Sequence, residues 1–403
     1  MRFDEFDFEP GIQDAVDAMN FKECTPIQER AIPVIMEGHD LIGVAQTGTG
    51  KTAAYLLPVL NALSKGDYPA DAVNCVIMSP TRELAQQIDQ QVEGFSYFVS
   101  VSSAAVYGGN DGIRFEQEKR GMSMGTDILI ATPGRLISHL SLGNCDLSKV
   151  SFFILDEADR MLDMGFYDDI MQIVARLPKK RQTLLFSATM PAEIQKLAGN
   201  ILTDPVEVKL AVSKPAEKIL QAAYICYEIQ KVPIIQSLFE DRKERRVIIF
   251  ASSKLKVKEV YKTLRGLGLN AAEMHSDLEQ SQRDEVMRGF RNGHVNVLVA
   301  TDIVSRGIDI DDIDLVINFD VPHDAEDYVH RIGRTARAGS DGCAITFVSP
   351  DDQTPFSSIE RLIGRDVYKI PLPAELGPAP EYAPHRKSRG KSGNGRRKYH
   401  SKS

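Results

Sequence analysis

The stretch AQTGTGKT, residues 45–52, follows a largely apolar run, residues 40–44, and precedes a segment compatible with a helix. Its glycines let backbone N–H groups wrap around nucleotide phosphates, with Lys51 as a point charge and Thr52 placed for Mg²⁺. The strict phosphate-loop pattern has glycine where this chain has Ala45, so the motif depends on its context. A strand before it and a helix after it predict a nucleotide site at the carboxyl end of a buried strand.

A second informative stretch is the acidic sequence DEAD, residues 156–159, which directly follows the apolar residues 152–155. Its first two carboxylates are suited to holding a metal ion and aiming a water molecule. The alternative is a solvated helix start, because acidic residues favour that end of the helix dipole. A helix start explains one or two carboxylates. It does not explain three carboxylates that directly follow four apolar residues, in a chain that also has a phosphate loop. The two stretches together predict ATP hydrolysis.

Length and composition indicate a soluble protein of more than one domain. The chain has 403 residues, 43% of them hydrophobic and 26% charged, which favours two globular domains with appendages. No apolar run reaches the length of a membrane span, and the first residues are acidic rather than signal-like. Five scattered cysteines without paired metal spacing indicate reduced thiols and no zinc module. We therefore expect a cytoplasmic protein with no membrane partner.

The net charge is unevenly distributed. Residues 384–403 carry eight Lys or Arg and no acidic residue, and because the whole chain has a net charge of −8, residues 1–383 carry −16. A segment rich in Gly, Ser and basic residues cannot build a core, so a disordered basic tail is expected. Composition alone leaves two roles equally open, a solubilising tail and a nucleic-acid contact.

Both halves of the chain alternate short apolar runs with helical stretches, which predicts an α/β fold of two domains with parallel sheets. In the first half the predicted strands are residues 41–44, 73–78, 128–130, 152–155 and 183–186. In the second half they are residues 247–250, 295–299, 315–318 and 344–348. Proline residues and a break in this alternation near 205–220 place the boundary there. The predicted parts are a first domain at 1–207, a linker at 208–220, a second domain at 221–372 and the tail at 373–403.

The second half has no phosphate loop of its own, so one nucleotide site shared by two similar domains is expected. It contains the basic string HRIGRTAR, residues 330–337. If this string is helical, Arg334 and Arg337 lie at i and i+3 and project from one face. An exposed basic helix is the simpler interpretation. Together with a phosphate loop elsewhere, the string suggests arginine fingers that reach the γ-phosphate.

At this point the motifs resemble those of the DEAD-box RNA helicases of superfamily 2, over roughly residues 1–370. The resemblance implies two tandem RecA-like domains, and among bacterial members the chain is most similar to the RhlE-like group. FKECTPIQ, residues 21–28, looks like the adenine-reading Q motif, in which Phe21 would stack on the base and the Gln28 amide would offer it a donor and an acceptor. Two departures lie here, Asn20 and Cys24, where the family usually has Gly and Pro.

The resemblance also implies the roles of single residues. Catalytic roles fall to Lys51, Asp156, Glu157, Arg334 and Arg337. Contacts to ATP fall to Phe21, Gln28, Gln46, Thr47, Gly48, Thr49, Gly50, Lys51, Thr52 and Asp309, with Mg²⁺ held by Thr52 and, through water, by Asp156. Coupling of hydrolysis to RNA binding falls to Asp159, Ser187, Thr189 and His330. RNA contacts fall to Pro80, Thr81, Arg82, Gly108, Gly109, Thr132, Gly134, Arg135, Gln280, Arg283, Thr301 and Asp302.

These RNA contacts consist of Arg side chains, hydroxyls and helix-start amides, which read the sugar–phosphate backbone and little sequence. Contacts to the 2′-OH would favour RNA over DNA. The resemblance thus implies an ATP-dependent RNA helicase that opens short duplexes or remodels RNA–protein complexes when its two domains close. An ATP-gated RNA clamp and an ATP-independent annealer acting through the tail remain open, and a translocating DNA helicase is the weakest alternative. Ribosome-assembly or RNA-decay proteins are the expected partners of a monomer.

Overall fold

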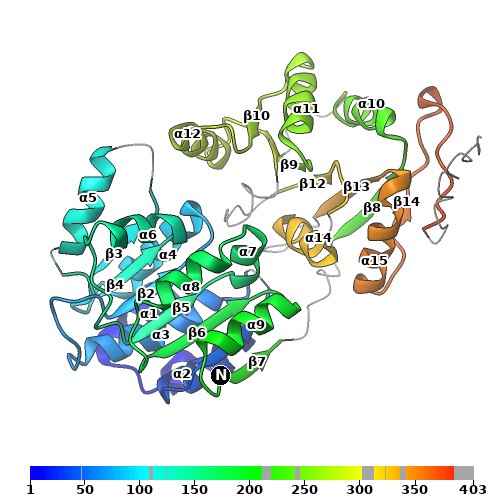
Figure 1. The fold of residues 1–403 in the computed structure, drawn as a ribbon. Helices are drawn as coiled ribbons and strands as arrows, with labels where there is room; N and C mark the ends of the chain where they lie inside the picture. Colours follow the sequence, from blue (N-terminus) through cyan, green and yellow to red (C-terminus); the bar gives the residue numbers. More distant parts are fainter. Residues whose placement is uncertain are drawn as a thin grey trace, which may run out of the picture. The chain divides into compact units, whose positions relative to one another are not determined.

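The structure is a computed structural model that describes residues 1–46, 48–108, 112–123, 125–210, 219–240, 246–301, 313–322, 324–335 and 342–384. Side chains at 112–114, 280, 326, 330 and 334 are not part of that description. The described residues divide into two compact units, one up to residue 210 and the other from residue 219, and each is an α/β layer structure (Figure 1). We call them unit 1 and unit 2 in chain order.

Unit 1 contains a seven-stranded parallel sheet in the order β3-β4-β2-β5-β6-β1-β7. Its strands are β1 (Leu41–Val44), β2 (Cys75–Met78), β3 (Ser103–Val106), β4 (Ile128–Ala131), β5 (Phe152–Leu155), β6 (Gln182–Ser187) and β7 (Val206–Lys209). Its helices are α1 (Pro10–Ala18), α2 (Pro26–Met36), α3 (Lys51–Ser64), α4 (Arg82–Phe95), α5 (Gly112–Ser123), α6 (Pro133–Ser141), α7 (Ala158–Asp163), α8 (Tyr167–Val174) and α9 (Ala192–Ile201).

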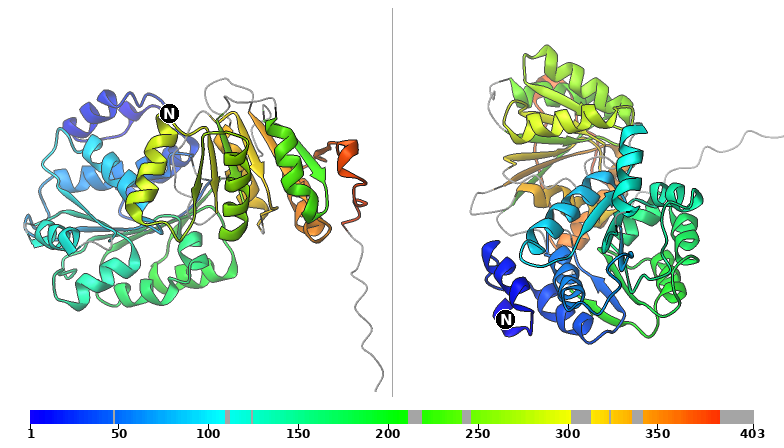
Figure 2. Two further views of the ribbon diagram at one scale, coloured as in Figure 1. Left: turned by 90° about the horizontal axis from the view of Figure 1, so that it is seen from above. Right: turned by 90° about the vertical axis from the view of Figure 1, so that its left-hand side faces the viewer.

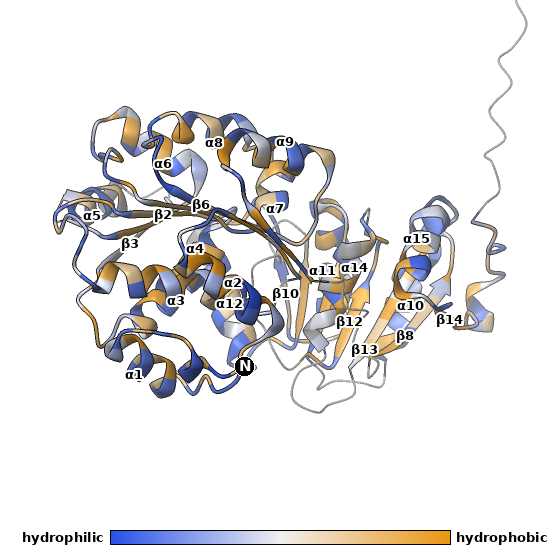
Figure 3. Ribbon diagram, turned by 90° about the horizontal axis from the view of Figure 1, so that it is seen from below, coloured by the Kyte–Doolittle hydropathy of each residue, from blue (hydrophilic) through white to orange (hydrophobic). Residues whose placement is uncertain are grey.

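Helices cover both faces of this sheet. One apolar core lies between the strands and α1 to α4, and includes Ile12, Tyr55 and Ile88. A second core lies between the opposite face and α6 to α9, and includes Met161 and Ile170. Figure 2 shows these layers from two further directions, and Figure 3 shows the apolar strands between the two helix layers. Strands β2, β4 and β5 are apolar throughout because both of their faces are buried.

Unit 2 repeats the strand order of unit 1, as β10-β11-β9-β12-β13-β8-β14, and every described pairing is parallel. Its strands are β8 (Leu220–Ile225), β9 (Val247–Phe250), β10 (Ala271–Met274), β11 (Val297–Ala300), β12 (Leu315–Asn318), β13 (Cys343–Val348) and β14 (Tyr368–Lys369). Helices α10 (Glu228–Phe239) and α11 (Lys254–Gly266) pack on one face. Helices α14 (Ala325–Ile332) and α15 (Gln353–Ile363) lie on the other (Figure 1), and α12 (Gln280–Arg291) contacts β10.

The predicted α/β fold with two parallel sheets is confirmed, and all nine predicted strands are present with small shifts at their ends. The prediction missed β3, β7, β8, β10 and β14. Four of these are edge strands, so they are not buried on both sides and carry small or polar residues instead of a continuous apolar run. The predicted linker overlaps β7, which ends at Lys209, and β8, which begins at Leu220.

The start of the predicted tail differs from the structure. Residues 373–384, which we call the strap, lie against unit 2 and include a 3₁₀ turn at Ala374–Leu376. Gln230 Nε2 donates to the Leu376 carbonyl (2.7 Å), and Gln353 Nε2 donates to the Glu381 carbonyl (2.7 Å). The tail prediction failed here because side-chain amides satisfy the backbone of this segment, a contact that composition cannot reveal. Residues 385–403 lie outside the described residues.

The basic string of unit 2 is not one continuous helix. Helix α14 ends at Ile332, and Gly333–Thr335 form a 3₁₀ turn. The spacing predicted for Arg334 and Arg337 on one α-helical face therefore does not hold for Arg334, which lies in the turn. The glycine at 333 favours the end of an α-helix at this point. Arg337 lies outside the described residues.

Candidate ATP site and RNA-binding edge

The carboxyl edge of the unit 1 sheet carries six of the predicted motif segments, in two neighbouring groups. The first group follows β1, β5 and β6, which are adjacent in the sheet, and consists of residues 45–52, 156–159 and 187–189. The second group follows β2, β4 and β3, also adjacent, and consists of residues 80–82, 132–135 and Gly108. The predicted ATP contacts and the predicted RNA contacts therefore share one edge of one sheet and occupy different halves of it.

The phosphate loop is held by its own backbone. Lys51 Nζ donates to the carbonyl of Ala45 (2.8 Å), and Thr49 Oγ1 donates to the carbonyl of Gln46 (2.7 Å). Gly50 has φ +87° and precedes α3, a left-handed conformation that glycine adopts without strain. Gln46 Nε2 is buried and has no hydrogen-bond partner among the described residues. The loop thus contains a lysine and an amide donor that phosphate oxygens could engage.

The Q-motif glutamine connects α2 to this loop. Gln28 Oε1 accepts the N–H of Thr25 (2.8 Å), which completes a capping box, and Gln28 Nε2 donates to the Gly50 carbonyl (3.1 Å). One amide hydrogen and one oxygen lone pair remain, which is the donor and acceptor pair expected for adenine. Phe21 packs edge-on against Phe3 and Phe95, with centroid distances of 5.8 and 5.3 Å.

Asp156 is a buried carboxylate with two hydrogen bonds. Tyr55 donates its hydroxyl to Oδ2 (2.9 Å), and the N–H of Glu157 donates to Oδ1 (2.9 Å). Burial raises the pKa of Asp156 to about 6, while Lys51 lowers this pKa and Glu157 raises it further. The ionised form of Asp156, which is the form that could bind a metal ion, is therefore favoured at neutral pH.

Glu157 lies in a strained backbone conformation. Its φ of 52° and ψ of 52° are left-handed, which costs a non-glycine residue about 1–2 kcal/mol. Its side chain is nearly buried and accepts Arg160 Nη1 at 2.9 Å. Strain at a buried carboxylate beside a phosphate loop is typical of an active site, because the surrounding structure must maintain it.

Asp159 contacts two other predicted coupling residues, Ser187 and Thr189. Asp159 Oδ2 accepts the backbone N–H groups of Ala188 and Thr189 (both 3.0 Å) and the Thr189 hydroxyl (3.2 Å). In return, Ser187 Oγ accepts the N–H of Asp159 (3.3 Å). The segment after β5 is therefore fixed to the segment after β6.

The second group of motifs presents two helix starts. Thr81 caps α4 by accepting the Leu84 N–H at its Oγ1 (3.3 Å), and Thr132 precedes α6. First-turn N–H groups of a helix lack intrahelical partners and favour anions. Gly108 has φ +74°, and Arg135 lies in the first turn of α6. This half of the edge is suited to the phosphates of a nucleic-acid backbone.

Unit 2 places two predicted RNA contacts at the equivalent end of its sheet. Thr301 directly follows β11, and Arg283 in α12 donates from Nη2 to the Ser276 carbonyl after β10 (3.2 Å). Outside the described residues lie the predicted site residues Thr47 and Gly109 in the first half of the chain and Asp302, Asp309 and Arg337 in the second, as do the side chains of Gln280, His330 and Arg334.

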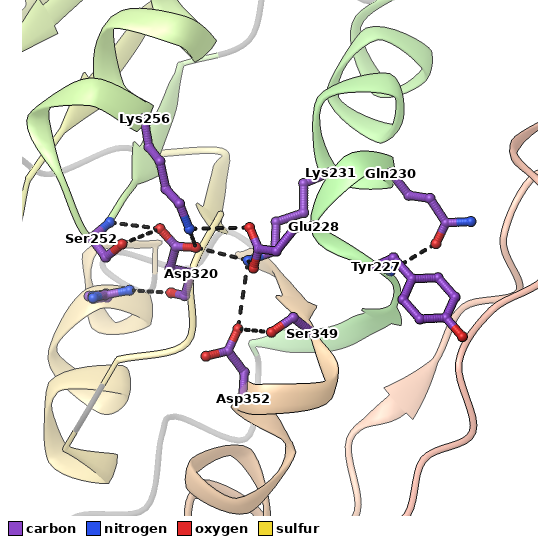
Figure 4. Close-up of polar contacts among 10 residues, drawn as sticks. Tyr227, Glu228, Gln230, Lys231, Ser252, Lys256, Asp320, Ser349 and Asp352 are labelled. Carbon is purple, nitrogen blue, oxygen red and sulfur yellow. Dashed lines mark hydrogen bonds and ion pairs between the residues drawn. The ribbon is translucent and has the colours of Figure 1, made fainter. Parts of the chain in front are cut away.

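Sequence reasoning missed a buried ionic network in unit 2, which we call the Lys231 cluster (Figure 4). Lys231 is fully buried, and its Nζ lies 2.7 Å from Glu228, 2.8 Å from Asp320 and 3.6 Å from Asp352. Asp320 also accepts Lys256 Nζ (2.6 Å) and both the N–H and the hydroxyl of Ser252 (2.8 and 2.7 Å). Burial raises the pKa of Asp320, but Lys231 and Lys256 hold it below its ordinary value.

The Lys231 cluster also borders the helix that carries the basic string. Arg331 Nη1 donates to the Asn318 side chain and to the Asp320 carbonyl (both 3.0 Å), and its guanidinium lies 5.0 Å from the Phe250 ring centre. The cluster therefore joins α10, α11 and the end of β12 to α14.

Within the described residues, no group of three or more His, Cys, Asp or Glu could hold a metal. A Mg²⁺ ion bound by Thr52 and Asp156 would need further oxygen ligands from phosphate and water, which is the usual arrangement for this ion.

Comparisons with known proteins agree with the motifs. The DEAD/DEAH box helicase family model matches residues 25–197, and the helicase conserved C-terminal domain matches residues 230–339. The ATP-dependent RNA helicase CshA of Listeria monocytogenes is 39% identical over 373 residues, which are 92% of this chain and 71% of that protein. The chain belongs to the DEAD-box RNA helicase family. A second CshA, from Geobacillus kaustophilus, is 38% identical over 92% of this chain and 78% of its own length.

Solved structures of this DEAD-box family resemble the chain in fold. Yeast Dbp5 bound to RNA and ADP BeF3 matches with a TM-score of 0.79 and 30% identity, over 91% of this chain and 95% of that one. The predictions of a DEAD-box family member and of two RecA-like domains are therefore confirmed, whereas the RhlE-like group remains a prediction. No helix in the described part of this chain has the length and hydropathy to cross a membrane.

Proposed function

We propose that this DEAD-box protein unwinds short RNA duplexes locally, by coupling ATP hydrolysis at the first half of the unit 1 edge to RNA held at the second half. The observation that carries the proposal is the adjacency of these two groups on one sheet, with the first group fixed internally by Asp159. Dbp5 bound to RNA and a nucleotide analogue supports a shared state with both ligands.

In this proposal Gln28 and Phe21 recognise adenine, and Lys51 leaves the Ala45 carbonyl to contact phosphate oxygens. Thr52 and, through water, Asp156 would hold Mg²⁺, which would neutralise charge on the phosphates. Glu157 orients the attacking water and accepts its proton. Arg334 and Arg337 supply positive charge from unit 2 when the units close, and His330 and Asp309 complete the nucleotide contacts.

The proposed RNA contacts are to the sugar–phosphate backbone, so we infer no sequence specificity and a preference for RNA through the 2′-OH. We further propose that the protein acts as a cytoplasmic monomer and that ribosome-assembly or RNA-decay proteins are its partners. The basic residues 385–403 would add affinity for RNA through phosphate contacts.

The deciding experiment measures the ATPase rate with single-stranded RNA, with matched DNA and with neither. Stimulation by RNA alone supports the proposal, equal stimulation by DNA contradicts the RNA preference, and no stimulation contradicts the coupling. A strand-displacement assay beside it separates the helicase from the ATP-gated clamp, which would hydrolyse ATP without releasing a strand. Truncation after Pro384 tests the annealer, because annealing through the tail would be lost while RNA-stimulated ATPase persists.

A further inference from the structure

The carboxylate of Glu118 on α5 joins two of the segments proposed to bind RNA. Glu118 is buried, with a side-chain exposure of 4%. Its Oε1 accepts the backbone N–H of Gly108, which follows β3 (3.1 Å). Its Oε2 accepts Arg135 Nε (2.6 Å) and lies 3.0 Å from His139 Nε2, both on α6 after β4. One buried side chain thus fixes two neighbouring loops of the sheet edge.

Two side chains contact the ring nitrogens of His139. Asn144 Nδ2 lies 3.3 Å from Nδ1, and Glu118 Oε2 lies 3.0 Å from Nε2. Beside them, the negative charge of Glu118 is paired with the positive charge of Arg135. A buried charge pair of this kind needs both partners, because removing one leaves the other uncompensated.

An aromatic ring holds the same arginine from a second side. Phe115, one turn before Glu118 on α5, stacks on His139 with a centroid distance of 4.2 Å and an interplanar angle of 12°. The Arg135 guanidinium carbon lies 4.6 Å from the same ring centre. A guanidinium this close to an aromatic ring is attracted to its face. Phe115 and Glu118 together therefore restrict the position of the Arg135 head group.

The way in which Arg135 is held leaves part of its head group without a partner. Glu118 engages Nε, whereas Nη2 is buried and has no hydrogen-bond partner among the described residues. A guanidinium has five donors that match a phosphate bidentately. Gly108 completes the arrangement, because a β-carbon at this position would lie 3.2 Å from Arg135 Cδ. The glycine thus allows its loop to pack directly on the arginine stem.

We infer that Glu118 and Phe115 are positioning residues for RNA binding, which hold Arg135 in the orientation that receives a backbone phosphate. The inference rests on the proposed role of Arg135 as an RNA contact. Neither positioning residue touches the RNA or the nucleotide in this assignment, so their effect is on the RNA concentration that the enzyme needs and not on the chemical step.

The test uses Glu118→Gln in the full chain, because this change keeps the volume of the side chain but removes its charge and replaces one acceptor oxygen by an NH2 donor. In either orientation of the amide, this NH2 faces another donor, the Arg135 Nε–H or the Gly108 N–H, so one of the two bonds is lost and the charge that holds the arginine is gone. We expect the RNA concentration for half-maximal ATPase to rise about tenfold, the scale of one charge-assisted hydrogen bond. The rate at saturating RNA should change less than twofold. Glu116→Gln, an exposed position of the same helix, is the matched control and should change neither quantity.

A double-mutant cycle separates the inference from the proposed function. If Glu118 acts through Arg135, the change to glutamine adds less than twofold once Arg135→Ala is present. A normal RNA requirement in Arg135→Ala alone contradicts the proposed role of Arg135. If Arg135→Ala needs more RNA for half-maximal ATPase but Glu118→Gln needs the same amount as wild type or less, the positioning role of Glu118 is wrong and the RNA contact of Arg135 stands.

A second variant keeps the inference testable if Glu118→Gln does not fold, which nucleotide binding without RNA would reveal. Phe115→Leu retains the carboxylate and removes the stacking surface. We expect the half-maximal RNA concentration to rise severalfold at an unchanged saturated rate. An unchanged half-maximal RNA concentration in this folded variant refutes the assignment.

Discussion

Replacing Asp320 by Asn tests how much the Lys231 cluster stabilises unit 2. Lys231 is fully buried, so loss of its anionic partner leaves a charge that water cannot reach. Breaking one partner of a buried pair costs about 3–5 kcal/mol. Lys231 keeps Glu228, itself half exposed, at 2.7 Å, so the lower value applies here. A cost of about 3 kcal/mol corresponds to a roughly 150-fold larger population of the opened state.

Hydrogen exchange followed by mass spectrometry on the full chain measures this effect locally. A local probe is needed because a chain of two units does not unfold as a two-state system. Peptides from β12 and α10 should exchange roughly 150-fold faster in Asp320→Asn than in wild type, which is the factor calculated above. Peptides from β5 in unit 1 should keep wild-type protection. The matched control is Asp277→Asn, which removes an exposed carboxylate between Lys254 and Lys258 and should change protection little. Wild-type protection of β12 in Asp320→Asn would refute the reasoning.

The same cluster predicts the pH dependence of this stability. Because the pKa of Asp320 is lowered in the folded state, its contribution is present above its ordinary pKa of about 3.9 and is lost as the pH falls through the lower folded value. The pKa of Lys231 is raised by Asp320 despite its burial, so its contribution is lost only above its ordinary value of about 10.4. The difference between wild type and Asp320→Asn should therefore be constant from about pH 5 to 9 and shrink below about pH 4.

Three further predictions concern the ATP site and the tail. Glu157→Gln should bind ATP and RNA while the RNA-stimulated ATPase rate falls about 10²–10⁴-fold, and near-normal turnover would contradict its role as the base. Gly50→Ala should raise the KM for ATP, since its β-carbon would lie 2.4 Å from Gln28 Nε2; Gly38→Ala, with a similar φ of +85° but open space around it, should leave that KM unchanged. Truncation after Pro384 should lower RNA affinity most at low salt and flatten its salt dependence, and an unchanged slope would exclude the tail as an RNA anchor.

The sequence was most informative where neighbouring residues share one task. Residues 45–52 and 156–159 are contiguous motifs that follow strands buried on both faces, so strand, loop and chemistry could be predicted together. The edge strands β3, β7, β10 and β14 gave no such signal, because one side of each is not paired within its sheet.

Contacts between distant residues were not predictable in this way. Tyr55 donates to a carboxylate 101 residues later in the chain, and Lys231 pairs with one 89 residues later. Glu118 lies in a polar helix whose sequence resembles an ordinary exposed helix. Periodicity and composition do not identify these side chains, because the topology of the fold determines which distant residues become their neighbours.

The strap has a consequence for any shortened form of the protein. Ending the chain at residue 372, where the folded part was predicted to stop, would leave the amides of Gln230 and Gln353 without their backbone acceptors and Glu360 without the hydroxyl of Tyr382. A proteolytic cut or premature stop in this segment would therefore remove more than positive charge. It would also remove Leu376 and so uncover the part of the unit 2 apolar core against which this side chain packs, which would mark a truncated product as damaged for cellular proteases.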